Sequence, residues 1–333
     1  MCKKCCTFAG HLNRRIMTEN ENKTTIAVVA LVVSMIIWSV SGIAIKHALA
    51  VLPPFTMIVL RFVPSVLLML IIGLICRKSS LFALQKIEWK DLPLFLIAGF
   101  CQPFLYYLLE TFTYDALNSP TIAETLLSTS PLLSPVFAAV LLRERVTRNN
   151  IIGIIISTVG VFALSLIGST DYSIGSYWGI LLAFAAVSAA VVDSIMMRKV
   201  PAHYTSLSFI FYAQCVSLIF FLPLWLWKEG DIVFSLQLSA ISSQLSTLNS
   251  PLSIALLCVA YLTVFASVIA FILFCFALRK VGVTQANAFN NIRPAFTALW
   301  MFLFFGEHLP LGKWIGMVLI IFGLFVCQKK ETR

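Results

Sequence analysis

The sequence predicts an all-α integral membrane protein of ten transmembrane helices, built as two inverted five-helix repeats with both termini cytoplasmic. Three observations support this prediction: the composition, a set of long apolar segments and an internal repeat. Of the 333 residues, 60% are hydrophobic and 11% are charged, whereas an ordinary soluble domain has about 25% charged residues. Because lipid accepts apolar side chains on the outside of a helix bundle, this composition indicates a membrane protein.

Runs of about 20 apolar residues, the length that crosses roughly 30 Å of hydrocarbon, define the predicted spans. Their limits are 26–46, 55–76, 92–113, 119–142, 150–167, 176–197, 205–227, 252–278, 283–306 and 311–327. The predicted organisation is a cytoplasmic tail (1–25), a first repeat (26–167), a second repeat (176–327) and a short cytoplasmic tail (328–333).

The distribution of Lys and Arg predicts which helix ends face the cytoplasm, because cytoplasmic loops retain positive charge. Most of the 24 Lys and Arg residues lie in the amino-terminal tail, in alternate loops or at the carboxyl end. We therefore expect a multi-pass membrane protein with both termini inside the cell. The net charge of +10 is spread over helix ends and forms no stripe, which argues against nucleic-acid binding.

The two halves of the chain share a sequence pattern. TIAETLLSTSPLLSPVFAAVLLRE, which starts at Thr121, aligns without a gap to TQANAFNNIRPAFTALWMFLFFGE, which starts at Thr284, at an offset of 163. The same offset continues through the next predicted helix and pairs Gly153 with Gly316 and Gly160 with Gly323. Since each half contains five spans, an odd number, the second half enters the membrane from the opposite side. Inverted repeats of this kind are typical of secondary transporters, which bind solute at the repeat interface.

These residues resemble one known family. The pattern SPLLSPVFAAVLLRE with a glycine nine residues later, its echo NNIRPAFTALWMFLFFGE, and the opening WSVSGIAIK followed by LPPFTMIVLRF are similar to ten-helix members of the drug/metabolite transporter superfamily of the EamA type. The resemblance implies an exporter of small metabolites in the inner or plasma membrane, often of amino acids or related compounds, driven by an ion gradient or by exchange. Nucleotide sugars and cationic drugs are the alternatives, because relatives in the same superfamily carry them.

Other classes of membrane protein fit the sequence less well. The chain has no His-rich cluster, paired acidic metal motif or GxSxG elbow, so we expect no enzyme, no cofactor and no metal site. A receptor or a scramblase is a more remote alternative. The amino-terminal Cys2, Cys5 and Cys6 lack a second pair of ligands; lipidation of Cys5 or Cys6, and a start at Met17, are left open.

Charged residues inside a predicted span are costly and indicate a bundle interior or a water-filled cavity. The candidates are Arg61, Glu110, Glu124 and Asp193. A carboxyl in a span needs a partner, a proton or a cavity, so Glu110 and Glu124 are the candidates for binding a coupling proton. Arg61 is the expected counter-charge of one of them. Asp193, with Arg198 five residues on, is expected to be structural.

A polar line runs along each of the two repeated helices. Glu124, Ser128 and Pro131 share a helix face, and their repeat partners are Asn287, Asn291 and Pro294. Each proline removes a backbone hydrogen bond, and the carbonyl groups thus freed, of Leu127 and Asn290, would face polar groups or a cation. The alternative is that the prolines only kink the helices and that the Asn side chains join neighbouring helices.

Arg293 and a few aromatic residues complete the predicted substrate site. Arg293 precedes Pro294 beside Asn290, and its repeat partner is the uncharged Ser130, so it breaks the symmetry of the repeats and is a candidate contact for substrate or counter-ion. Side chains with a flat apolar face and a polar tip suit a small amphipathic solute. These are Trp38, Tyr106, Tyr107 and Tyr212, for which anchoring at the membrane interface is the alternative.

Two further features are read as structural. Glu144 and Glu307 each end a repeated helix, and we expect each carboxylate to lie near the amino terminus of the following helix. The fifth and tenth spans contain Gly153 with Ser157 and Gly312 with Gly316 at four-residue spacing. Small residues at this spacing let helices approach closely, either within one chain or between two copies in a homodimer.

Overall fold

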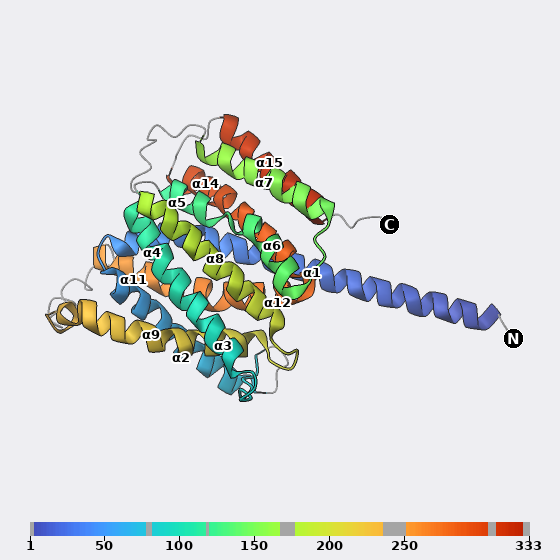
Figure 1. The fold of residues 1–333 in the computed structure, drawn as a ribbon, viewed down its shortest axis with the longest axis horizontal. Helices are drawn as coiled ribbons and strands as arrows, with labels where there is room; N and C mark the ends of the chain where they lie inside the picture. Colours follow the sequence, from blue (N-terminus) through green and yellow to red (C-terminus); the bar gives the residue numbers. More distant parts are fainter. Residues whose placement is uncertain are drawn as a thin grey trace.

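The computed structural model describes residues 3–77, 82–117, 120–166, 177–235, 251–305 and 311–328, and these residues contain helices and no strand. The helices are packed side by side as a bundle (Figure 1). Those of the first half are α1 (Lys3–Leu49), α2 (Pro54–Ile75), α3 (Leu92–Gly99), η1 (Phe100–Leu105), α4 (Tyr106–Ala116), α5 (Pro120–Leu127), α6 (Ser130–Leu142) and α7 (Arg148–Leu166). Those of the second half are α8 (Tyr177–Lys199), α9 (Ser206–Ser235), α11 (Pro251–Tyr261), η2 (Leu262–Ile269), α12 (Ala270–Val281), α13 (Val283–Ala288), η3 (Phe289–Asn291), α14 (Ile292–Phe305) and α15 (Leu311–Gln328).

Seven helical segments in the described part of the chain are long and apolar enough to cross a membrane. They correspond to the first four predicted spans and to the sixth, seventh and eighth. The fifth and tenth predicted spans coincide with α7 and α15, whose apolar parts are shorter, and the ninth coincides with α13, η3 and α14. The described parts of all ten predicted segments are therefore mainly helical, and ten membrane crossings remain a prediction.

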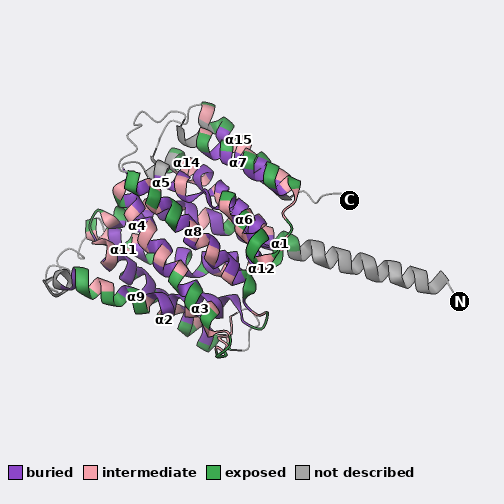
Figure 2. Cartoon of the chain, in the orientation of Figure 1, coloured by how far each residue is buried: buried purple, intermediate pink, exposed green. Residues whose placement is uncertain are grey.

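The outer surface of the bundle is apolar. Large hydrophobic side chains such as Ile75, Val140 and Phe325 are more than 70% exposed, and exposed positions are spread along the outer sides of the helices (Figure 2). A soluble protein rarely leaves so much large apolar surface in water. This surface is what lipid would cover, and the protein is a membrane protein.

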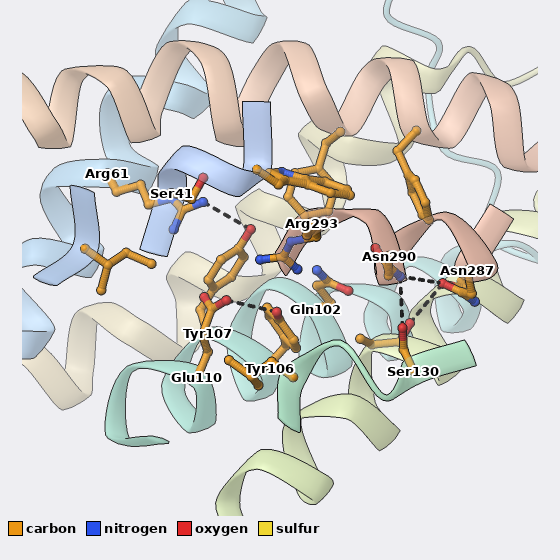
Figure 3. Close-up of a pocket in the computed structure, with 17 residues that line it drawn as sticks. Ser41, Arg61, Gln102, Tyr106, Tyr107, Glu110, Ser130, Asn287, Asn290 and Arg293 are labelled. Atoms are coloured by element: carbon orange, nitrogen blue, oxygen red, sulfur yellow. Dashed lines mark hydrogen bonds between the residues drawn. The ribbon is translucent and has the colours of Figure 1, made fainter. Parts of the chain in front are cut away.

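The third and eighth predicted spans are irregular at equivalent positions. A π-helical turn, η1, joins α3 to α4, and a second one, η2, joins α11 to α12. The repeat offset of 163 residues brings η1 onto η2. Gln102 in η1 has extended backbone angles (φ −149°, ψ 121°) and precedes Pro103, which has no N–H to donate. The break in η1 therefore has a local cause in the sequence, and Gln102 lies beside Arg293 in the wall of a pocket (Figure 3).

The fourth and ninth predicted spans are broken where the repeated prolines stand. The break between α5 and α6 comes just before Pro131, and the 3-10 turn η3 lies between α13 and α14 just before Pro294. The two breaks meet, because the amide of Asn290 donates a hydrogen bond of 2.9 Å to the hydroxyl of Ser130. The predicted helix breaks are thus present, and they join the two halves of the chain.

The glycines of α7 and α15 pack against each other. A Cβ atom on Gly153 would lie 2.5 Å from the carbonyl oxygen of Gly323, and one on Gly160 would lie 2.7 Å from that of Gly316. The repeat aligns Gly153 with Gly316 and Gly160 with Gly323. The contact of Gly153 with Gly323 is therefore equivalent, in the other half, to the contact of Gly160 with Gly316. Both glycine faces are used within one chain, so they give no support to the homodimer alternative.

Glu144 contacts a different helix from the one expected. Its carboxylate accepts hydrogen bonds from the backbone N–H groups of Val283 and Thr284, at the start of α13, and not from the following helix α7. Burial raises the pKa of the Glu144 carboxyl, and the charge of Arg198 opposes this shift. Gly282 makes room for the carboxylate and has a positive φ of 94°. The prediction that Glu144 lies at the amino terminus of α7 is wrong, because its carboxylate interacts with the amino terminus of α13 instead. Glu307 lies outside the described residues.

Candidate functional site

A polar cavity lies between the two halves of the chain, beside the breaks in the fourth and ninth predicted spans (Figure 3). Side chains from α1, α2, η1, α4, α5 and α6 line it together with side chains from α8, α12, α13, η3 and α14. The lining residues are Trp38, Ser41, Ile45, Arg61, Gln102, Tyr106, Tyr107, Glu110, Leu127, Ser130, Ala190, Ser194, Phe271, Phe274, Asn287, Asn290 and Arg293. The position agrees with a shared site at the repeat interface.

A buried ion pair lies at the edge of this cavity. An Nη atom of Arg293 lies 3.1 Å from a carboxylate oxygen of Glu124, and the hydroxyl of Tyr114 donates a hydrogen bond of 2.5 Å to the other oxygen. Arg61 was the expected counter-charge, and for Glu124 this expectation is wrong. The partner is the arginine that interrupts the symmetry of the two repeats, and it comes from the opposite half of the chain.

Arg61 is held by neutral groups. Its Nε donates a hydrogen bond of 2.7 Å to the hydroxyl of Ser267, and an Nη atom donates one of 3.2 Å to the hydroxyl of Tyr107. The guanidinium also lies 4.3 Å from the centre of the Tyr107 ring, a favourable cation–π arrangement. Arg61 therefore lies in the cavity wall, and its guanidinium forms no ion pair with a carboxylate among the described residues.

Glu110 also has a neutral partner. The hydroxyl of Tyr106, one helical turn away on α4, donates a hydrogen bond of 2.9 Å to its carboxylate. Glu110 lines the cavity, whereas Glu124 does not. The two carboxyls that the sequence analysis treated alike thus differ: one lies in the cavity wall and one is paired with an arginine.

The predicted polar lines divide between the cavity and the scaffold. Asn287 and Asn290 line the cavity, and Asn290 hydrogen-bonds both Asn287 (3.3 Å) and Ser130. Asn291 instead donates to the hydroxyls of Ser157 and Thr158 on α7. For Asn291 the alternative reading, a residue that joins neighbouring helices, is therefore the one observed. Ser128 is buried and does not line the cavity.

Three of the four predicted aromatic residues belong to the cavity. Trp38 donates a hydrogen bond of 3.0 Å from its ring nitrogen to the carbonyl of Ala266 in η2, and Tyr106 and Tyr107 line the wall beside Glu110. Tyr212 does not line it: its hydroxyl donates to the carbonyl of Gln85 in the segment before α3. For Tyr212 the prediction was wrong, because its ring packs against Phe95 and Phe211.

Some lining residues were missed by the sequence analysis. Ser41, Ser194, Phe271 and Phe274 carry no charge and have no distinctive spacing, so nothing marked them. Gln102 stands before Pro103 inside a predicted span, and that proline was the available signal.

Several polar atoms in the cavity wall have no partner among the described residues. These are the hydroxyl oxygen of Ser41, the amide nitrogen of Asn287 and the Nε of Arg293. Buried polar atoms are normally hydrogen-bonded, to protein or to water. The space that a water-sized sphere can occupy is about 50 Å³, enough for roughly three to five waters. The wall is therefore suited to a small polar molecule.

One group of metal-ligating side chains lies outside this cavity. Glu88, Asp91 and His203 bring ligand atoms within 4.8 Å of one another. They belong to surface loops, and Glu88 forms a 2.6 Å ion pair with Lys90. Solvated acidic residues commonly cluster in this way without a metal. Cys2 lies outside the described residues, and the side chains of Cys5 and Cys6 are not described.

The arrangement of broken helices from two inverted halves around a central polar cavity is that of a secondary transporter. A model of the EamA-like transporter family matches residues 25–166 and 177–327. The chain belongs to the EamA-like transporter family, part of the drug/metabolite transporter superfamily, and this family consists of transporters and not of enzymes.

Similar proteins agree with this assignment. A Bacillus subtilis (strain 168) protein named uncharacterized transporter YetK is 26% identical over 310 residues, 92% of this chain and 88% of that protein. A Streptantibioticus cattleyicolor protein named "Probable terminal-alkyne amino-acid exporter" is 24% identical over 244 residues, 72% of this chain and 74% of that protein. A solved crystal structure has a TM-score of 0.68 at 20% identity, covering 92% of this chain and 98% of that one, which shows the fold alone.

Proposed function

We propose that this transporter exports small zwitterionic metabolites such as amino acids across the cell membrane, by alternating access and in exchange for protons. The observation that carries the proposal is the set of unpartnered polar atoms on Ser41, Asn287 and Arg293 in a cavity shared by both halves. A bound polar solute would satisfy these atoms. The direction, export, follows the name of the Streptantibioticus relative, an amino-acid exporter.

The charges of the cavity suit a zwitterion. Arg61 and Arg293 would attract a carboxylate, and Arg293 still has a free Nε to donate. Glu110 would attract an ammonium group, and the nearby rings of Trp38 and Tyr106 offer apolar surface to a side chain. A purely cationic drug would meet two arginines, so the cavity favours an amino acid over that alternative.

The size of the cavity argues against the other alternative. Space for a few water molecules matches a small amino acid and is far below the volume of a nucleotide sugar. The name of the Streptantibioticus relative, an amino-acid exporter, supports the same substrate class.

Exchange for protons would use Glu110. This carboxyl lines the cavity and, among the described residues, has Tyr106 alone as a hydrogen-bond partner, so it would bind either a proton or the ammonium group of the solute. Competition of this kind links the two flows in opposite directions. Glu124, the other predicted proton carrier, already has Arg293 as its counter-charge, and we assign it the role of holding that arginine in place.

Glu110→Gln tests the proposal, because the amide keeps the size of the side chain and cannot bind a proton in this way. Purified protein in liposomes should accumulate a labelled amino acid when a pH gradient is applied, and Glu110→Gln should lose this flux at normal folded yield. Glu88→Gln, at an exposed loop glutamate, is the matched control and should keep it. Gradient-driven flux unchanged in Glu110→Gln would contradict the role of Glu110.

A further inference from the structure

Asp193 on α8 is a buried carboxyl that the proposed site does not use. Its side chain is 1% exposed, and its Oδ1 has no hydrogen-bond partner among the described residues. The sequence analysis expected a structural role beside Arg198. The guanidinium of Arg198 instead hydrogen-bonds the backbone carbonyl of Arg279 at the end of α12. Asp193 therefore lacks the partner that a structural carboxylate would need.

The surroundings of Asp193 are almost wholly apolar. It lines a small pocket with Pro103, Met197, Phe209, Ile210, Ala213 and Phe271, together with the amides Gln102 and Gln214. The space for a water-sized sphere is about 10 Å³, room for roughly one water. An ionised carboxylate in such a place loses its hydration without gaining a partner, which is strongly unfavourable.

The neighbouring polar groups do not compensate this charge. The side-chain oxygen of Gln214 accepts from Ser65 and its nitrogen donates to the carbonyl of Ser267, and no hydrogen bond from Gln214 or Gln102 reaches Asp193 Oδ1 among the described residues. The titratable groups that face Asp193 are Cys101 of η1, Tyr107 of α4 and Cys275 of α12, and none of them is a cation.

Among the described residues, the other elements packed on α8 bring no Lys or Arg to the wall of the Asp193 pocket. The sequences of α3, α6 and α13 contain no titratable residue, and Glu124 of α5 is paired with Arg293. On α12, Arg279 is occupied by the backbone carbonyls of Val200, Pro201 and Tyr204.

The Asp193 pocket adjoins the substrate cavity. Gln102 and Phe271 line both spaces, and Gln102 is the residue at which the backbone of η1 leaves the helical conformation. A rearrangement of η1 around Gln102 would therefore change both the wall of the cavity and the access of water to Asp193.

We propose that Asp193 is a proton-binding site separate from the substrate cavity, protonated in this conformation and deprotonated when the pocket opens to water. Binding a proton converts the carboxylate into a neutral carboxylic acid, and opening returns the proton to water. This inference rests on the proposed proton exchange and adds a second proton to each cycle, besides the one that competes for Glu110. Sodium would need several oxygen ligands, which the apolar side chains of the pocket do not supply.

The stoichiometry of exchange tests this proposal. In liposomes with one unit of pH difference and no membrane potential, each exchanged proton raises the limiting accumulation of a neutral zwitterion about tenfold. Wild type should reach about 100-fold and Asp193→Asn about tenfold. Asp115→Asn, at an exposed aspartate on α4, should match wild type. Equal accumulation by wild type and Asp193→Asn would overturn the proposal.

Two further readouts separate this site from the proposed function. In detergent near neutral pH, the infrared carbonyl band of protonated carboxyl groups should lose intensity in Asp193→Asn and not in Asp115→Asn. This holds even if wild type shows no pH-driven accumulation, a result that would sink proton exchange alone. Unchanged intensity would overturn the Asp193 site. Accumulation driven by sodium and not by pH would replace the proton with that ion.

Discussion

Arg293 is a buried residue at which the two repeats differ in charge. The repeat aligns it with Ser130, and in the structure the two residues line the same cavity from opposite halves. Its pairing with Glu124 holds a buried guanidinium at the edge of the polar cavity. We propose that this difference between the repeats gives the cavity a defined end for an anionic group.

The ion pair makes a prediction about stability. Glu124→Gln leaves Arg293 buried without its counter-charge, and breaking a buried pair in this way costs about 3 to 5 kcal/mol in the free energy of unfolding. Glu124→Gln combined with Arg293→Gln removes both charges and should recover most of that loss. Chemical unfolding in detergent measures all three variants. A double variant that loses the sum of the two single effects would show that the pair is not coupled.

At the residue scale, the sequence predicted the charged residues of the cavity and few of its neutral residues. Glu110, Arg61 and Arg293 were found because a charge inside an apolar segment has few structural explanations. Pairing was not predictable, since Glu124 and Arg293 are far apart in sequence. Tyr212 was misassigned because its contact, with Gln85, is also far away in sequence. Only tertiary packing distinguishes a tyrosine that faces a cavity from one that hydrogen-bonds a loop.

At the scale of helices, irregular backbone is concentrated where the cavity lies. Both repeated prolines follow a break, and η1 and η2 occupy equivalent positions in the two halves. Irregular backbone at membrane depth is tolerated where it is buried in protein or lines a cavity. The proline breaks were predictable from the sequence, whereas η2 contains no proline or glycine and gave no signal.

The glycine contact between α7 and α15 gives an element-scale prediction. A methyl group at Gly160 would lie 2.7 Å from the carbonyl oxygen of Gly316, so Gly160→Ala must push the two backbones apart. We expect a loss of about 1 to 3 kcal/mol in the free energy of unfolding. Gly230→Ala, where the added atom meets nothing within 4 Å, is the matched control. Thermal unfolding in detergent compares them, and equal melting temperatures would refute the close contact.

At the scale of the whole molecule, the inverted repeat explains why the site lies where it does. The contact between Gly153 and Gly323 and the contact between Gly160 and Gly316 are equivalent by the repeat. The two proline breaks meet through the hydrogen bond between Asn290 and Ser130. The sequence predicted this architecture because an odd number of spans per repeat fixes the inversion. It did not predict the contact between Glu144 and α13, because a helix terminus accepts a carboxylate from any element that reaches it.

The central claim is that solute crosses through the cavity at the meeting point of the two broken helices. The most direct test is exchange of a labelled amino acid across liposomes by wild type and by Ser130→Trp, whose ring would fill the cavity. We predict exchange by wild type, by Ser130→Ala and by Ser188→Trp on the outer side of α8, and none by folded Ser130→Trp. Exchange at the wild-type rate in folded Ser130→Trp would contradict the claim.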